Sequence, residues 1–124
     1  MTDTNEERLV AFSKAIITLC REISAERILI PLAGQLLRSG TSAALNYGEA
    51  RGASSRRDFI HKLNLVIKEL RETHVNLRIV DQSVPIKSQA LLLHTIDECN
   101  QLISIFVKSV NTAKANEERR ASSE

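Results

Sequence analysis

The stretch Phe59–Val80, FIHKLNLVIKELRETHVNLRIV, decides the fold. Its mostly apolar seam alternates between spacings of four and three residues, the pattern of a helix packed lengthwise against other helices. The members of this seam are Phe59, Leu63, Val66, Leu70, Thr73, Leu77 and Val80. Upstream, Ser55 and Asp58 form a capping-box pattern, in which side chains bond the free amides at a helix start. The sequence therefore predicts a helix over residues 56–80.

Three further segments carry the same periodicity and predict helices at 5–24, 31–51 and 86–113. Thr4 is the expected N-cap of the first helix. Gly52 is expected to end the second helix in a left-handed conformation. No segment alternates with a period of two for long enough to indicate a strand.

The connections before and after the predicted helix at 56–80 are short, which favours antiparallel packing of neighbouring helices. The fold class predicted is therefore all-α, an antiparallel up-down-up-down four-helix bundle. We expect the bundle to span residues 1–113, and residues 114–124, KANEERRASSE, to form a disordered polar tail because they have no apolar periodicity.

Composition excludes several classes of function. The chain has 124 residues, which suits one domain. It has no segment that could serve as a signal peptide or span a bilayer, so we expect a cytoplasmic protein without a membrane partner. Its histidines and its two cysteines are scattered and it has no phosphate-binding glycine loop, so we expect no metal, no cofactor and no small-molecule substrate.

A polar stripe runs along one face of the second predicted helix, and it consists of Ser39, Ser42, Asn46 and Glu49. The third predicted helix offers Lys62, Glu69 and Glu72. Buried polar groups need partners, so we expect an internal network that fixes how the helices align. A ligand site is the alternative. An enzyme site built from Asn46, Glu49, Lys62 and Glu69 is a weaker hypothesis, and we expect that the protein is not an enzyme.

A ridge of small residues, Gly40, Ala44 and Gly48, recurs every four positions on another face of the second helix. Glycine inside a helix costs about 1 kcal/mol relative to alanine, so the ridge indicates that something approaches the backbone closely. A helix of the same chain and a helix of another subunit both fit this pattern.

Positive charge gathers in the middle of the chain. Residues 38–78 hold eight basic and four acidic side chains. Arginines in the first turn of the third helix oppose the helix dipole, and a bound anion would reverse that effect. We interpret this basic cluster as a candidate contact for nucleic-acid phosphates, with a solvated turn as the alternative; its members are Arg38, Arg51, Arg56, Arg57 and Lys62. Only 3% of residues are aromatic, which argues against base stacking.

The run Gln35–Leu77, QLLRSGTSAALNYGEARGASSRRDFIHKLNLVIKELRETHVNL, resembles the four helix bundle protein family, also called the 23S rRNA-intervening-sequence or S23 family. The resemblance spans about Phe12–Lys114. The polar signature of the family matches Arg38, Ser39, Ser42, Asn46, Glu49, Glu69 and Glu72. The resemblance implies a small bacterial four-helix bundle that assembles as a homo-oligomer of five subunits, with a role in RNA inferred and no enzymatic activity established.

These observations leave two main hypotheses of function. The first is a non-enzymatic homo-oligomer that binds RNA or another nucleic acid through the basic cluster. The alternative is a protein–protein interaction scaffold that binds no nucleic acid and uses the polar stripe and the small-residue ridge as subunit contacts.

Overall fold

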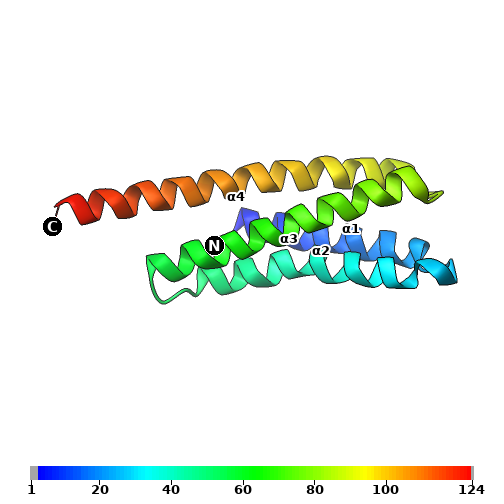
Figure 1. Ribbon diagram of the computed structural model, residues 1–124, viewed down its shortest axis with the longest axis horizontal. Helices are drawn as coiled ribbons and strands as arrows, with labels where there is room; N and C mark the ends of the chain where they lie inside the picture. Colours follow the sequence, from blue (N-terminus) through cyan, green and yellow to red (C-terminus); the bar gives the residue numbers. More distant parts are fainter. Residues whose placement is uncertain (1–2, 124) are drawn as a thin grey trace.

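The computed structural model describes residues 3–123, and they form four long helices (Figure 1). These are α1 (Thr4–Ile23), α2 (Ile30–Arg51), α3 (Arg56–Ser83) and α4 (Gln89–Ser123), with a short 3-10 turn, η1 (Arg27–Leu29), before α2. Within this described range there is no strand, so the prediction of an all-α fold is confirmed.

The helices run alternately up and down, and each packs beside the next one in the chain (Figure 1). The predicted antiparallel bundle is therefore confirmed as well. The first and last helices, α1 and α4, close the bundle. They contact each other less extensively than the pairs α1–α2, α2–α3 and α3–α4 do. Bidentate hydrogen bonds from Arg8 to the Glu98 carboxylate, at 3.1 and 2.6 Å, join these two helices.

The predicted seams form the core. On α3, the positions from Leu63 to Val80 in the seam are all buried, including Thr73. On α4, Phe106 is completely buried and its ring lies 5.3 Å from that of Tyr47 on α2. Phe59, at the start of the α3 seam, is only partly buried.

Several helix ends differ from their predictions. α3 ends at Ser83 instead of residue 80, and α4 begins at Gln89 instead of residue 86. Two caps differ as well. The N-cap of α1 is Asp3, not Thr4, and its carboxylate accepts from the amides of Asn5 and Glu6 at 2.9 and 3.0 Å. Gly52 follows α2 with a φ of −95°, so it is not left-handed. Its amide instead reaches back to the carbonyl of Glu49, a tightened last turn that any residue can adopt. The Ser55 cap is as predicted, since its hydroxyl accepts from the Asp58 amide at 3.0 Å.

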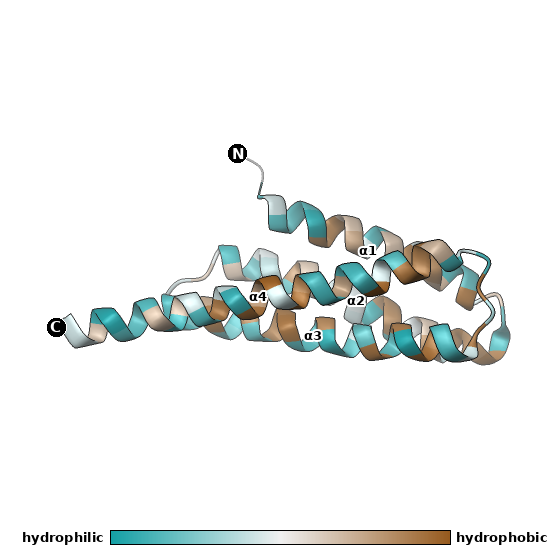
Figure 2. Cartoon of the chain, turned by 90° about the horizontal axis from the view of Figure 1, so that it is seen from above, coloured by the Kyte–Doolittle hydropathy of each residue, from teal (hydrophilic) through white to brown (hydrophobic). Residues whose placement is uncertain are grey.

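The C-terminal residues also differ from the prediction. A disordered tail was expected at 114–124, but α4 continues as a helix to Ser123; Glu124 lies outside the described residues. The segment has no glycine or proline and is rich in Ala, Glu, Lys and Arg, which all favour helix without any apolar periodicity. This end projects past the α2–α3 turn, and its surface is largely hydrophilic (Figure 2).

Candidate nucleic-acid interface

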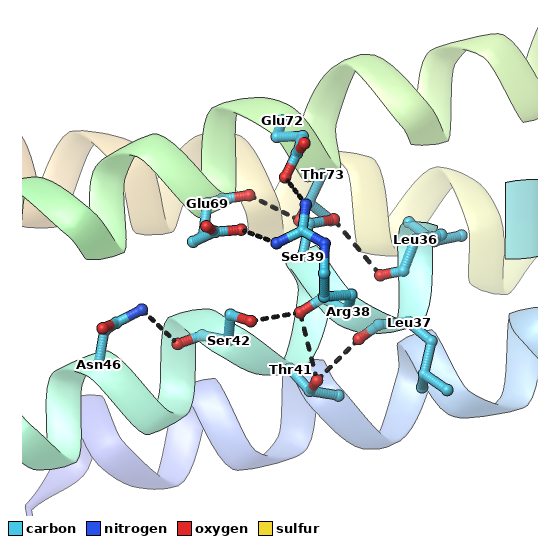
Figure 3. A network of polar contacts seen from close by, with 10 residues as sticks. All are labelled: Leu36, Leu37, Arg38, Ser39, Thr41, Ser42, Asn46, Glu69, Glu72 and Thr73. Atoms are coloured by element: carbon cyan, nitrogen blue, oxygen red, sulfur yellow. Dashed lines mark hydrogen bonds and ion pairs between the residues drawn. The ribbon is translucent and has the colours of Figure 1, made fainter. Parts of the chain in front are cut away.

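A buried hydrogen bond joins the polar stripe of α2 to α3. The hydroxyl groups of Ser39 and Thr73 lie 2.9 Å apart, and both side chains are 0% exposed (Figure 3). The Thr73 hydroxyl also lies 2.7 Å from the carbonyl of Glu69 on its own helix. Because an unpaired buried hydroxyl is costly, this pair favours one alignment of α2 against α3.

Arg38, beside the stripe, and Glu49, in the stripe, meet opposite charges across the same helix pair. Arg38 reaches from α2 to the carboxylates of Glu69, at 3.2 Å, and Glu72 (Figure 3). The amine of Lys62 lies 3.5 Å from the carboxylate of Glu49. Two of the four stripe residues, Ser39 and Glu49, thus bond to α3 of the same chain.

Ser42 and Asn46 bond within α2 instead. The Ser42 hydroxyl donates to the carbonyl of Arg38 at 2.5 Å, and the Asn46 amide donates to the carbonyl of Ser42 at 3.0 Å. Asn46, Glu49, Lys62 and Glu69, the residues of the enzyme hypothesis, are therefore engaged in helix bonds and ion pairs.

The small-residue ridge has different surroundings along its length. A Cβ added to Gly40 would lie 2.8 Å from both γ carbons of Ile16, so this glycine allows α1 to approach α2. Ala44 is partly buried against the core. A Cβ on Gly48 would meet nothing within 4 Å, and the same holds for Gly34. The close approach at Gly40 is made by α1 of the same chain.

The basic cluster is divided by the fold. Arg38 lies about 20 Å along α2 from Arg51, at 1.5 Å per residue, and so stands apart from the turn. Arg51 pairs with Asp3, at 3.4 Å, and with Glu6. Arg56 pairs with Glu117 of α4 at 3.3 Å. Arg57 is exposed and has no ion pair among residues 3–123.

A groove of about 800 Å³ lies beside the α2–α3 turn, bounded by the end of α2, the start of α3 and the C-terminal half of α4. Every ionisable side chain that lines it is basic, namely Arg51, Arg56, Lys108 and Arg120. Its apolar lining includes Phe59 and Ile105, which are both partly exposed.

Sequence reasoning missed Lys108 and Arg120. Both belong to α4, more than fifty residues beyond the turn that they face, and Arg120 was assigned to the tail. A signal for them existed, because Ile105, Lys108, Thr112, Asn116 and Arg120 follow at helical spacing and share one side of α4.

The buried thiols offer no reactive nucleophile at neutral pH. Burial raises the pKa of Cys20 to about 11 and that of Cys99 to about 12, so both remain protonated. Over the part of the chain described, no cluster of three His, Cys, Asp or Glu side chains could hold a metal ion. Nor does any described helix have the length and apolar character needed to cross a membrane.

The fold and its interhelical polar network define a small antiparallel four-helix bundle protein. A family model, 23S rRNA-intervening sequence protein, matches residues 7–108, and the chain belongs to this family. Its fold is similar to a crystal structure of a protein with unknown function from the S23 ribosomal protein family of Bacteroides thetaiotaomicron, with a TM-score of 0.77 and 27% identity. That match covers 86% of this chain and 98% of the other. No curated protein matches the chain.

Proposed function

We propose that the protein is a non-enzymatic homo-oligomer that binds RNA or another nucleic acid through phosphate contacts at the basic groove. The observation that carries this proposal is the groove lining, whose ionisable side chains are all Arg or Lys. Contacts between such side chains and phosphates supply the sequence-independent part of nucleic-acid affinity.

The ion pairs around the groove do not oppose this role. Arg51, Arg56 and Glu117 are all at least one-third exposed, and exposed ion pairs contribute only about 0–1 kcal/mol. A phosphate can replace a carboxylate at either arginine at little cost. Lys108 and Arg120 have no ion pair within the described range, so they are free to bind directly.

Binding should therefore depend strongly on salt and on the groove cations. We expect the double variant Arg56→Gln with Lys108→Gln to weaken RNA binding and to flatten the plot of log affinity against log salt by about one unit per lost contact. Fluorescence anisotropy with a labelled RNA at several salt concentrations measures both quantities.

The matched control is Arg27→Gln with Lys87→Gln, which removes the same charge from exposed positions at the opposite end of the bundle. This control should bind like the wild type. An equal loss of RNA affinity in the two double variants would show that only the net charge matters. No RNA binding by the wild type at low salt would refute the proposal and favour the scaffold alternative.

Self-association is supported by a second feature, an apolar groove of about 370 Å³ between the end of α1 and the start of α2. Its exposed apolar side chains are Ile17 (39%), Ile30 (51%) and Leu37 (41%). Gly34 lies among them with open space above its backbone. We propose that a second copy of the chain packs here, which moves the proposed interface away from the polar stripe.

Leu37→Glu tests this placement, because a carboxylate in a packed apolar interface is strongly disfavoured. We expect a wild-type native mass five times that of the 13.8 kDa chain and a lower mass for the variant. Light scattering coupled to size exclusion measures both. Leu93→Glu, at a similarly exposed position on α4, is the control and should keep the wild-type mass. A variant Leu37→Glu of unchanged mass would show that the interface lies elsewhere.

A further inference from the structure

We infer that the basic groove seats an unpaired nucleotide of a single-stranded nucleic acid, with its base against Phe59 and its phosphates on the surrounding cations. This inference rests on the proposed function, but it is more specific. Contact with phosphates alone gives no preference for a single strand, since a duplex has the higher charge density. A seated base, by contrast, requires a strand whose bases are free.

The low aromatic content argues against stacking of several bases along a strand, but one aromatic residue, Phe59, points to a single stacked base. The chain has four aromatic residues, and Phe12, Tyr47 and Phe106 are buried in the core. Phe59 alone is only partly buried, although it begins the apolar seam of α3. It lines the groove beside the α2–α3 turn, where the ionisable residues are all Arg or Lys.

The groove lining combines apolar and charged side chains. Phe59 and Ile105 are partly buried and Ala113 is buried, whereas Arg51, Lys108 and Arg120 are exposed and Arg56 is partly exposed. Ser55, Thr112 and Asn116 add side chains that can donate and accept hydrogen bonds. These three kinds of side chain match the parts of a nucleotide. The apolar side chains suit the flat face of a base, the polar side chains suit its edges, and the exposed cations suit the phosphate.

Size agrees with this assignment. Small-ligand sites commonly enclose about 300–1,000 Å³, and this groove measures about 800 Å³. A base can enter such a groove only when it is unpaired, and proteins that recognise single-stranded RNA commonly stack splayed bases on aromatic rings. A duplex would meet only the exposed cations.

The test compares three labelled probes by fluorescence anisotropy at one low salt concentration. They are a short single-stranded RNA, the same strand annealed to its complement, and a strand of the same length without bases. We expect the single strand to bind the wild type roughly tenfold more tightly than the other two, as stacking of one base implies.

Two variants locate the effect at the ring. Phe59→Leu keeps an apolar side chain but removes the aromatic face, and it should lose only the preference for the single strand. Phe59→Tyr keeps the face and should keep the preference. Circular dichroism confirms folding, and equal binding of the three probes by the wild type overturns the inference even where Phe59→Leu does not fold.

The outcomes separate this inference from the proposed function. Equal binding of all three probes, or a preference unaffected by Phe59→Leu, overturns the seated base while phosphate binding stands. No binding of any probe overturns both. Competition by uridine monophosphate at the same concentration as the strand would assign the groove to free nucleotides and overturn the inference of a strand.

Discussion

Gly40 is a position where α1 packs closely against the backbone of α2, and its missing side chain permits the contact. An added methyl group would lie 2.8 Å from the side chain of Ile16, which is completely buried. We expect Gly40→Ala to lower the free energy of unfolding by about 1–3 kcal/mol, because overpacking forces the neighbouring helix away.

Gly48, on the same helix, is the matched control. An added methyl group there meets nothing within 4 Å, so only the helix propensity changes and Gly48→Ala should raise stability by about 1 kcal/mol. Urea unfolding of both variants at one protein concentration measures the difference. If both substitutions changed the free energy of unfolding in the same direction, this account of the α1–α2 contact would be contradicted.

Individual pairings could be predicted only in part from the sequence. Spacing placed Ser39 on a face shared with Asn46, but Ser39 meets Thr73 across the helix interface while Asn46 bonds its own helix. Residues seven apart turn together with the helix, so the choice depends on which α3 side chain lies opposite each of them, and residue spacing within α2 does not specify this. Likewise, the spacing of the small-residue ridge could not distinguish Gly40, which contacts Ile16, from Gly48, which is open.

At the scale of an element, α1 depends on a charged cap. Besides the two amides, the Asp3 carboxylate accepts from the Tyr47 hydroxyl at 2.8 Å, and Arg51 lies 3.4 Å away. The amide of Glu6, followed by the Tyr47 hydroxyl, lowers the pKa of Asp3 below its ordinary value of 3.8. Asp3 therefore ties the start of α1 to the end of α2.

The lowered pKa has a defined consequence for stability. Because the carboxyl group loses its proton more readily in the folded state, the charge adds stability that is complete above about pH 4 and is lost as the pH falls further. We expect the stability difference between wild type and Asp3→Asn, which keeps a capping oxygen, to be constant from pH 5 to 8 and to shrink below pH 4. Urea unfolding across this range checks it, and a constant difference down to pH 2.5 would refute it.

The helices themselves were largely predictable, since apolar periodicity is a local property of the sequence. The start of α4 was not, because it depends on a distant residue. The Glu22 carboxylate, on α1, accepts from the amides of Lys87 and Ser88 at 3.1 and 3.3 Å, just before α4 begins at Gln89. No pattern near residue 88 predicts that an acid more than sixty residues earlier will bond there.

At the scale of the whole molecule, the candidate site arises where helices of unequal length meet. α4 has 35 residues and α1 has 20, so the C-terminal part of α4 projects beyond its neighbours (Figure 1). The basic turn was predictable as a local cluster. The groove was not, because its other wall, with Lys108 and Arg120, exists only once the bundle has assembled.

The projecting end of α4 should contribute to the groove but little to the stability of the bundle. Ala113 is the last buried residue, and beyond it the described side chains are exposed or partly exposed. Among residues 3–123, one ion pair ties this end to the bundle, Arg56 with Glu117, and it is partly exposed and worth about 0–1 kcal/mol. A chain ending at Ala113 should therefore unfold within about 1 kcal/mol of the full chain.

Urea unfolding followed by circular dichroism tests both parts of this expectation. The shortened chain should lose the helical signal of residues 114–123, and it should bind RNA more weakly because it lacks Arg120 and Asn116 of the groove. A much larger loss of stability would show that the domain extends past Ala113. Unchanged RNA binding would show that the wall formed by the end of α4 takes no part in the interface.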